Sequence, residues 1–156
     1  MRWKKYMPYL VFILISLAAG GLSAIAVMRG LPAYERLAKP PLTPPSAAFP
    51  VVWGILYILM GAGAARVWLT RGRGRGAALA LYGLQLALNL LWSVWFFALG
   101  LRLFAFVWLL ALAAAVGLMI RAYYKIDRPA AWLQVPYLAW SVFAAYLNFG
   151  VWLLNR

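Results

Sequence analysis

The sequence predicts an all-α membrane protein, a five-transmembrane-helix bundle with a proline-rich loop between its first two helices. Its composition is the first reason: 67% of the residues are hydrophobic and 11% are charged, with a mean hydropathy of +0.86. A soluble domain carries about a quarter charged residues. The second reason is a set of five apolar runs of about 20 residues, the length that crosses a hydrocarbon core as a helix.

Polar residues, Pro and Gly separate the five runs and end each helix. The predicted helices cover residues 7–28, 49–69, 77–99, 103–122 and 130–154, within a single domain over residues 1–156. The first run follows a basic start, as in a secretory signal. It exceeds the upper limit of about 15 residues for a signal core, so we interpret it as a retained first helix.

The predicted loop, residues 29–48, contains the run KPPLTPP at residues 39–45. Proline fixes φ, lacks an amide hydrogen and pushes the preceding residue out of the helical conformation. This run therefore cannot continue a helix, and taken alone it is a linker. Its rigidity would also suit a pre-shaped lid, because little conformational entropy would be lost on closing over a ligand.

Basic residues are distributed unevenly between the two sides that five spans create. The N-terminal side carries Arg2, Lys4, Lys5, Arg66, Arg71, Arg73, Arg75, Arg121, Lys125 and Arg128. The other side carries Arg29, Arg36, Lys39, Arg102 and Arg156. Lys and Arg concentrate in cytoplasmic loops. We therefore expect a multi-pass protein of a bacterial cell membrane, with the N-terminus in the cytoplasm and loop 29–48 outside.

The net charge of +13 and the run RGRGRG at residues 71–76 resemble features of nucleic-acid-binding segments. We interpret the run instead as a cytoplasmic turn whose charges fix the topology and contact anionic membrane lipid. No nucleic-acid partner is expected.

The chain contains neither Cys nor His, and its acids are Glu35 and Asp127, both in predicted loops. It therefore lacks the groups for disulfides, for thiolate or imidazole metal sites, and for Ser-His-Asp or ordinary acid–base catalysis. An acid within a span, as in proton-coupled pumps, is also missing. We expect no metal, no cofactor and no catalytic residue, and favour the binding or passage of an apolar molecule.

Aromatic and polar residues recur at helical spacing on three predicted helices. The faces are Trp53, Tyr57, Met60, Gly61 and Ala64; Gln85, Asn89, Trp92, Ser93 and Phe96; and Gln134, Tyr137, Trp140, Ser141, Ala144 and Asn148. A buried amide in lipid must be paired, so Gln85 and Asn89 point into the bundle. They either bond neighbouring helices or line a cavity for a flat ligand, and spacing alone leaves both open.

Small residues four apart, at 61 and 65, 76 and 80, and 83 and 87, permit close contact between helices. The contact is either internal packing or the seam of a homodimer, and the spacing does not choose between them.

Four blocks of the chain resemble the TspO/MBR family of tryptophan-rich sensory and translocator proteins. The first is Tyr34-x-x-Leu37-x-Lys39-Pro40-x-x-x-Pro44-Pro45. The second is Phe49-Pro50-x-x-Trp53-x-x-Leu56-Tyr57-x-x-Met60-Gly61. The others are Gln85-Leu86-x-Leu88-Asn89-x-x-Trp92-Ser93-x-x-Phe96-Phe97 and Pro136-Tyr137-Leu138-x-Trp140-Ser141-x-Phe143-Ala144-x-x-Leu147-Asn148. Ala33 and Leu42 stand where many relatives carry tryptophan.

The resemblance implies a five-helix bundle, usually a homodimer, with a pocket that opens near the first loop. It implies binding of porphyrins such as protoporphyrin IX, of isoquinoline carboxamide and benzodiazepine ligands, and of sterol-like lipids. The implied ligand-binding residues are Tyr34, Pro44, Trp53, Asn89, Trp92, Ser93, Trp140 and Ala144, and the helical faces add Tyr57, Gln85 and Tyr137.

Three functions fit these observations. The first is binding, and with it transport or sensing, of a porphyrin or another flat apolar ligand. The second is light-dependent porphyrin breakdown, in which Trp53 and Trp140 would supply reactive indoles and the ligand the photochemistry. The third is a ligand-responsive membrane regulator that acts through a partner.

Overall fold

The computed structural model describes residues 2–156, and every regular element among them is helical. In chain order the elements are the 3₁₀ turn η1 (Arg2–Lys5), α1 (Met7–Glu35), α2 (Ala48–Leu69), α3 (Arg75–Ser93), the π-helical turn η2 (Val94–Ala98), α4 (Arg102–Tyr124), α5 (Arg128–Trp132) and α6 (Val135–Leu154). The segments long and apolar enough to cross a membrane are Trp3–Glu35, Ala48–Leu69, Arg75–Ala98, Arg102–Tyr124 and Arg128–Leu154. The predicted all-helical bundle with five spanning segments is confirmed.

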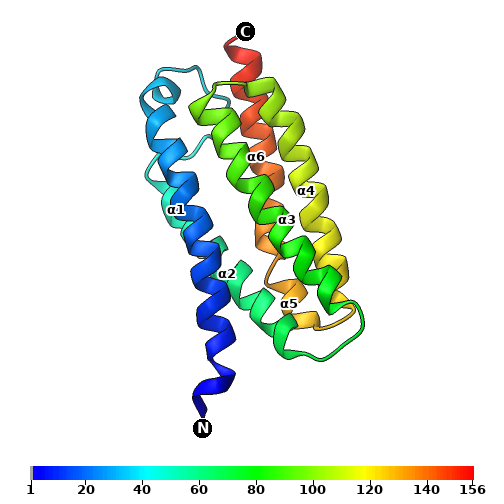
Figure 1. Cartoon of the computed structure of the whole chain (residues 1–156). Helices are drawn as coiled ribbons and strands as arrows, with labels where there is room; N and C mark the ends of the chain where they lie inside the picture. Colours follow the sequence, from blue (N-terminus) through cyan, green and yellow to red (C-terminus); the bar gives the residue numbers. More distant parts are fainter. Residues whose placement is uncertain (1) are drawn as a thin grey trace.

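The long helices surround a common interior (Figure 1). α1 packs against α2 on one side and α3 on the other, α3 packs against α4, and α4 packs against α6. α6 and α2 touch only sparsely. The turns at residues 70–74 and 125–127 lie at the N-terminal end of the bundle, and the loop 36–47 lies at the opposite end, near the C-terminus (Figure 1).

α1 continues to Glu35, beyond the predicted end at residue 28, so the first loop covers 36–47 instead of 29–48. Pro32 inside the helix removes only one backbone hydrogen bond. Packing compensates for this loss, because the Tyr34 ring is buried against the rings of Phe96 and Phe97. Glu35, expected in a loop, therefore closes the last turn of α1.

The third and fifth predicted helices are each divided in two. The run predicted as 77–99 is α-helical from Arg75 to Ser93 and then becomes the π-helical turn η2. The run predicted as 130–154 breaks after α5 and restarts at Val135. Pro136 cannot donate a backbone hydrogen bond to the preceding turn, which explains a break at this point.

Small residues bring α1 close to its neighbours. A Cβ atom at Gly61 would overlap the α1 backbone at Ile13, and one at Gly30 would overlap the backbone carbonyl of Phe97 in η2. The small residue at 61 therefore allows close packing of α2 against α1 within one chain. Gly76 and Gly83, by contrast, have open space at the Cβ position.

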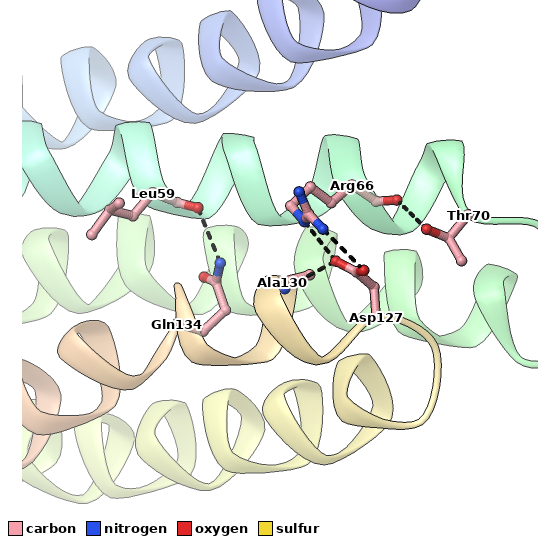
Figure 2. A network of polar contacts seen from close by, with 6 residues as sticks. All are labelled: Leu59, Arg66, Thr70, Asp127, Ala130 and Gln134. Atoms are coloured by element: carbon pink, nitrogen blue, oxygen red, sulfur yellow. Dashed lines mark hydrogen bonds and ion pairs between the residues drawn. The ribbon is translucent and has the colours of Figure 1, made fainter.

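An ion pair joins α2 to the start of α5 at the N-terminal end (Figure 2). Arg66 donates from Nε to Asp127 Oδ2 at 2.6 Å and from Nη2 to Oδ1 at 3.1 Å. Asp127 Oδ2 also accepts from the backbone N–H of Ala130 at 3.0 Å and so caps α5. Nearby, Gln134 Nε2 donates to the carbonyl of Leu59 at 3.0 Å.

We expect Asp127→Asn to lower the free energy of unfolding by about 0.5–1 kcal/mol at pH 7, because Asn keeps a cap but leaves the Arg66 side chain, which is 37% exposed, without its anion. Hydrogen bonds from Arg66 hold the pKa of Asp127 below its usual value. The stabilisation is therefore complete above a pH of about 4 and is lost as pH falls through the folded pKa. Unfolding by denaturing detergent at several pH values measures the difference. A difference that grows as pH falls would contradict the assignment.

Candidate ligand-binding site

A cavity of about 440 Å³ lies between α1, α2, α6 and the end of α3 with η2. Its lining comes from the C-terminal half of α1, the first turns of α2 and the second half of α6, so it occupies the end of the bundle nearest loop 36–47. The lining side chains are mostly apolar, and none is ionised. Size and lining are those of a site for a small or medium-sized apolar molecule.

Seven aromatic residues line the cavity: Tyr34, Phe49, Trp53, Tyr57, Trp92, Phe96 and Phe97. The Trp53 and Trp92 ring centroids are 6.1 Å apart with planes inclined by 37°. Trp92 in turn stacks on Phe96 at 5.9 Å and 26°. These rings form a continuous wall, and the faces of such rings favour a flat conjugated partner.

The turn η2 places two consecutive phenylalanines, Phe96 and Phe97, on the cavity wall. Its π geometry is marked by the hydrogen bond from Leu99 N to Val94 O at 3.0 Å, five residues apart. π-helical turns are rare in proteins, and those that occur often lie at functional sites. Helical periodicity places Phe96 on the same face as Asn89 and Trp92 but not its neighbour Phe97, and neither was among the predicted ligand-binding residues.

A chain of polar groups follows one edge of the cavity. Tyr57 Oη donates to Asn89 Oδ1 at 3.3 Å, and Asn89 Nδ2 donates to Tyr137 Oη at 2.9 Å. Farther along, Trp92 Nε1 donates to Asn148 Oδ1 at 3.1 Å. Asn89 therefore joins three helices and also lies on the cavity wall. For this amide, bonding of neighbouring helices and lining of a cavity are both true.

Seven predicted site residues come together on this wall: Tyr34, Trp53, Tyr57, Asn89, Trp92, Ser93 and Ala144. Tyr137 lies directly behind them, fully buried, with its ring edge-on to Trp53 at 6.1 Å.

Gln85 and Pro44 are not on the wall. Gln85 is fully buried between α2 and α3, where its Nε2 lies 3.7 Å from Met60 Sδ. The Gln85 amide therefore bonds neighbouring helices and does not line the cavity. Pro44 is half-buried in the loop and does not line the cavity. The cavity is reached instead by three later residues, Ser46, Phe49 and Pro50.

Trp140 lies outside the cavity. It lines a separate apolar groove between α2 and α6, together with Leu56, Leu59 and Phe143 among others. Its ring packs edge-on against Phe49 at 6.0 Å, and Phe49 in turn lines the cavity. The sparse contact between α2 and α6 leaves room for the indole on this side.

α1 contributes a cavity wall whose residues, apart from Tyr34, were not predicted from the sequence. Gly20, Ala24, Val27 and Leu31 follow the spacing i, i+4, i+7 and i+11 along the cavity, and Ser23 lies beside them. The signal for this wall was the run of small residues at 18–21, in a helix that is otherwise apolar on every side.

The loop 36–47 is hydrogen-bonded to α6 and to Asn155, the residue that follows α6. Asn155 binds both backbone groups of Ala38, accepting from N at 3.0 Å and donating to O at 2.8 Å. Tyr146 Oη donates to the carbonyl of Pro41 at 2.9 Å. Lys39 Nζ lies 5.0 Å from the centroid of the Tyr34 ring, which places a cation beside the cavity wall.

Comparison with known proteins identifies the family. The model of the TspO/MBR family matches residues 11–153, which include every residue of the cavity lining. The chain belongs to the TspO/MBR family. Within this family it is 40% identical over 124 residues to the tryptophan-rich protein TspO of Chlorobaculum tepidum, covering 78% of each chain.

Two further TspO/MBR relatives extend the comparison. The translocator protein of Sus scrofa is 37% identical over 155 residues, which cover 97% of this chain and 92% of the relative. The tryptophan-rich sensory protein of Cereibacter sphaeroides is 38% identical over 122 residues, which cover 78% and 76%. Family membership and five spanning helices make this an integral, multi-pass membrane protein.

Proposed function

We propose that the protein binds a porphyrin, of the type of protoporphyrin IX, in the cavity between α1, α2, α3 and α6. The observation that carries the proposal is the wall of Trp53, Trp92 and Phe96, whose stacked and tilted rings border a space of about 440 Å³. A flat conjugated ring packs favourably against such a wall. Isoquinoline carboxamide and sterol-like ligands share the flat, apolar shape and belong to the same proposal.

The distribution of charge supports one orientation of the ligand. The cavity lining carries no ionised side chain, whereas Lys39 lies beside the ring of Tyr34, at the end of the cavity nearest loop 36–47. Propionate groups would therefore remain at this end, where a cation offsets their charge, and the macrocycle would enter the apolar part. The absence of His and Cys from the chain favours a metal-free porphyrin over haem, because the usual strong axial ligands of haem iron are missing.

Binding is the function that the geometry supports, and transport or sensing would follow from it. The bonds between loop 36–47 and α6 support a role for this loop as a lid. Light-dependent breakdown by two indoles receives less support, because Trp53 lines the cavity and Trp140 lines the separate groove. We further propose that the N-terminal end of the bundle faces the cytoplasm, on the basis of its excess of Lys and Arg.

Titration of the purified protein with protoporphyrin IX tests the proposal. We expect saturable binding, which is monitored as a shift of the Soret band of the porphyrin. Trp53→Leu should weaken it about tenfold, the equivalent of the roughly 1–1.5 kcal/mol of an aromatic contact. Trp140→Leu, the matched loss of an indole from the groove, should change the affinity by less than about threefold. Absence of saturation would refute the proposal, and a larger effect at Trp140 than at Trp53 would move the ligand to the groove.

A further inference from the structure

Ser23 differs from the other buried serines in the part of the chain that the structure describes. Ser16 Oγ lies 2.8 Å from Tyr82 Oη, Ser93 Oγ donates to the carbonyl of Asn89 at 3.4 Å, and Ser141 Oγ donates to that of Tyr137 at 2.8 Å. Ser23 is 6% exposed, and its hydroxyl has no hydrogen-bond partner among residues 2–156. An unpaired buried hydroxyl destabilises a fold, so its presence requires an explanation.

The Ser23 hydroxyl stands on the wall of the cavity. Ser23 lines the cavity from α1, and its Oγ lies near the hydroxyl of Tyr57 on α2 without a hydrogen bond of acceptable geometry between them. The Tyr57 hydrogen is already donated to Asn89 Oδ1. Since the Ser23 hydroxyl has no hydrogen-bond partner among residues 2–156, its O–H is available to a molecule in the cavity.

Asn89 adds a second donor to the same wall. Its Nδ2 carries two hydrogens, and the bond to Tyr137 Oη uses one of them. Asn89 also lines the cavity. The polar edge of an otherwise apolar space thus offers hydrogen-bond donors, which select an acceptor on the ligand.

The acceptor should be neutral. No ionised side chain lines the cavity, and Ser23 lies within a membrane-spanning helix. A carboxylate buried there would have no counter-ion, which makes its burial unfavourable. A ketone, aldehyde, ester or amide oxygen accepts the same hydrogen bonds without this penalty.

We propose that Ser23 is a specificity-determining residue that selects ligands with a neutral carbonyl oxygen on the edge that enters the cavity, away from any charged groups. The inference rests on the proposed function, since it names the ligand class of the same site. It also gives the unpaired hydroxyl its partner.

Two porphyrins that differ only in this group provide the test. Diacetyldeuteroporphyrin IX carries two acetyl groups where mesoporphyrin IX carries two ethyl groups, and both have the same propionates. Their affinities are measured for the wild type, for Ser23→Ala and for Ser141→Ala. Ser141→Ala is the matched control, because it also removes a buried hydroxyl, but one that is bonded to backbone and absent from the cavity lining.

We expect Ser23→Ala to weaken diacetyldeuteroporphyrin binding about fivefold or more, the effect of one lost hydrogen bond, and to leave mesoporphyrin binding within about twofold. The ratio of the two affinities should be unchanged in Ser141→Ala. Comparing ratios between variants cancels differences between the porphyrins in solubility and membrane partition.

The outcomes separate the inference from the function on which it rests. If the wild type binds both porphyrins and Ser23→Ala leaves the ratio of affinities unchanged, the assignment of Ser23 is wrong and porphyrin binding stands. If the wild type binds neither porphyrin, the proposed function fails, and the assignment of Ser23 fails with it.

Discussion

Replacing Gly54 by Phe is expected to lower the affinity for protoporphyrin IX at least about 30-fold, the equivalent of about 2 kcal/mol, without unfolding the protein. Gly54 lines the cavity, and a Cβ atom built on it meets no atom within 4 Å. A larger side chain at this position would therefore extend into the cavity instead of colliding with a helix. It would occupy the space in which the macrocycle is proposed to lie.

Gly83→Phe is the matched control for this prediction. Gly83 also has open space at its Cβ position, but it lies on the outside of α3 and away from the cavity lining. Both variants should keep the detergent-unfolding midpoint of the wild type, and Gly83→Phe should keep its affinity as well. Unchanged affinity in a folded Gly54→Phe variant would place the ligand elsewhere.

The second large effect is expected on stability, from Gly30→Val. The Cβ atom alone would overlap the carbonyl of Phe97, and this atom belongs to the backbone of η2 and cannot rotate away. α1 and η2 must then separate, which we expect to lower the free energy of unfolding by about 3 kcal/mol. Because Tyr34 and Phe97 meet at the same contact, porphyrin affinity should fall too.

Gly117→Val in α4 is the matched control, because it measures how replacing Gly by Val changes the free energy of unfolding where no steric conflict arises. Gly117 lies inside a spanning helix with open space around its Cβ position. Its replacement should change the free energy of unfolding by less than about 1 kcal/mol, the usual range for a substitution in a helix without a steric conflict. Equal losses in Gly30→Val and Gly117→Val would show that close approach of α1 to η2 does not control stability.

Sequence periodicity located much of the cavity wall but not all of it. Trp53 and Tyr57, like Asn89, Trp92 and Ser93, lie on regular α-helix, where a spacing of 3.6 residues identifies the buried face. Phe97 reaches the cavity only because η2 is a π-helical turn, and the periodicity of the sequence does not predict such a turn.

Two other differences have separate physical causes. α1 is apolar around its whole circumference, so no pattern distinguished the face with Gly20 and Ser23 from the face toward lipid. Trp140 shares helical spacing with Tyr137, but residues three apart are rotated by about 60° around a helix. The open side between α2 and α6 then directs the Trp140 indole into the groove.

The extension of α1 to Glu35 shows how tertiary contacts override a local signal. Pro32 and the prolines that follow it predicted an early end to the helix. The buried contacts of Tyr34 with Phe96 and Phe97 come from residues far along the chain, and they determine that the last turns remain helical.

A crystal structure of the protein with protoporphyrin IX tests the central claim most directly. We predict that the macrocycle lies between α1, α2, η2 and α6, with its plane against Trp53 and Trp92 and its propionates toward Lys39. A macrocycle bound in the groove between α2 and α6, against Trp140, or on the outer surface of the bundle would contradict the claim.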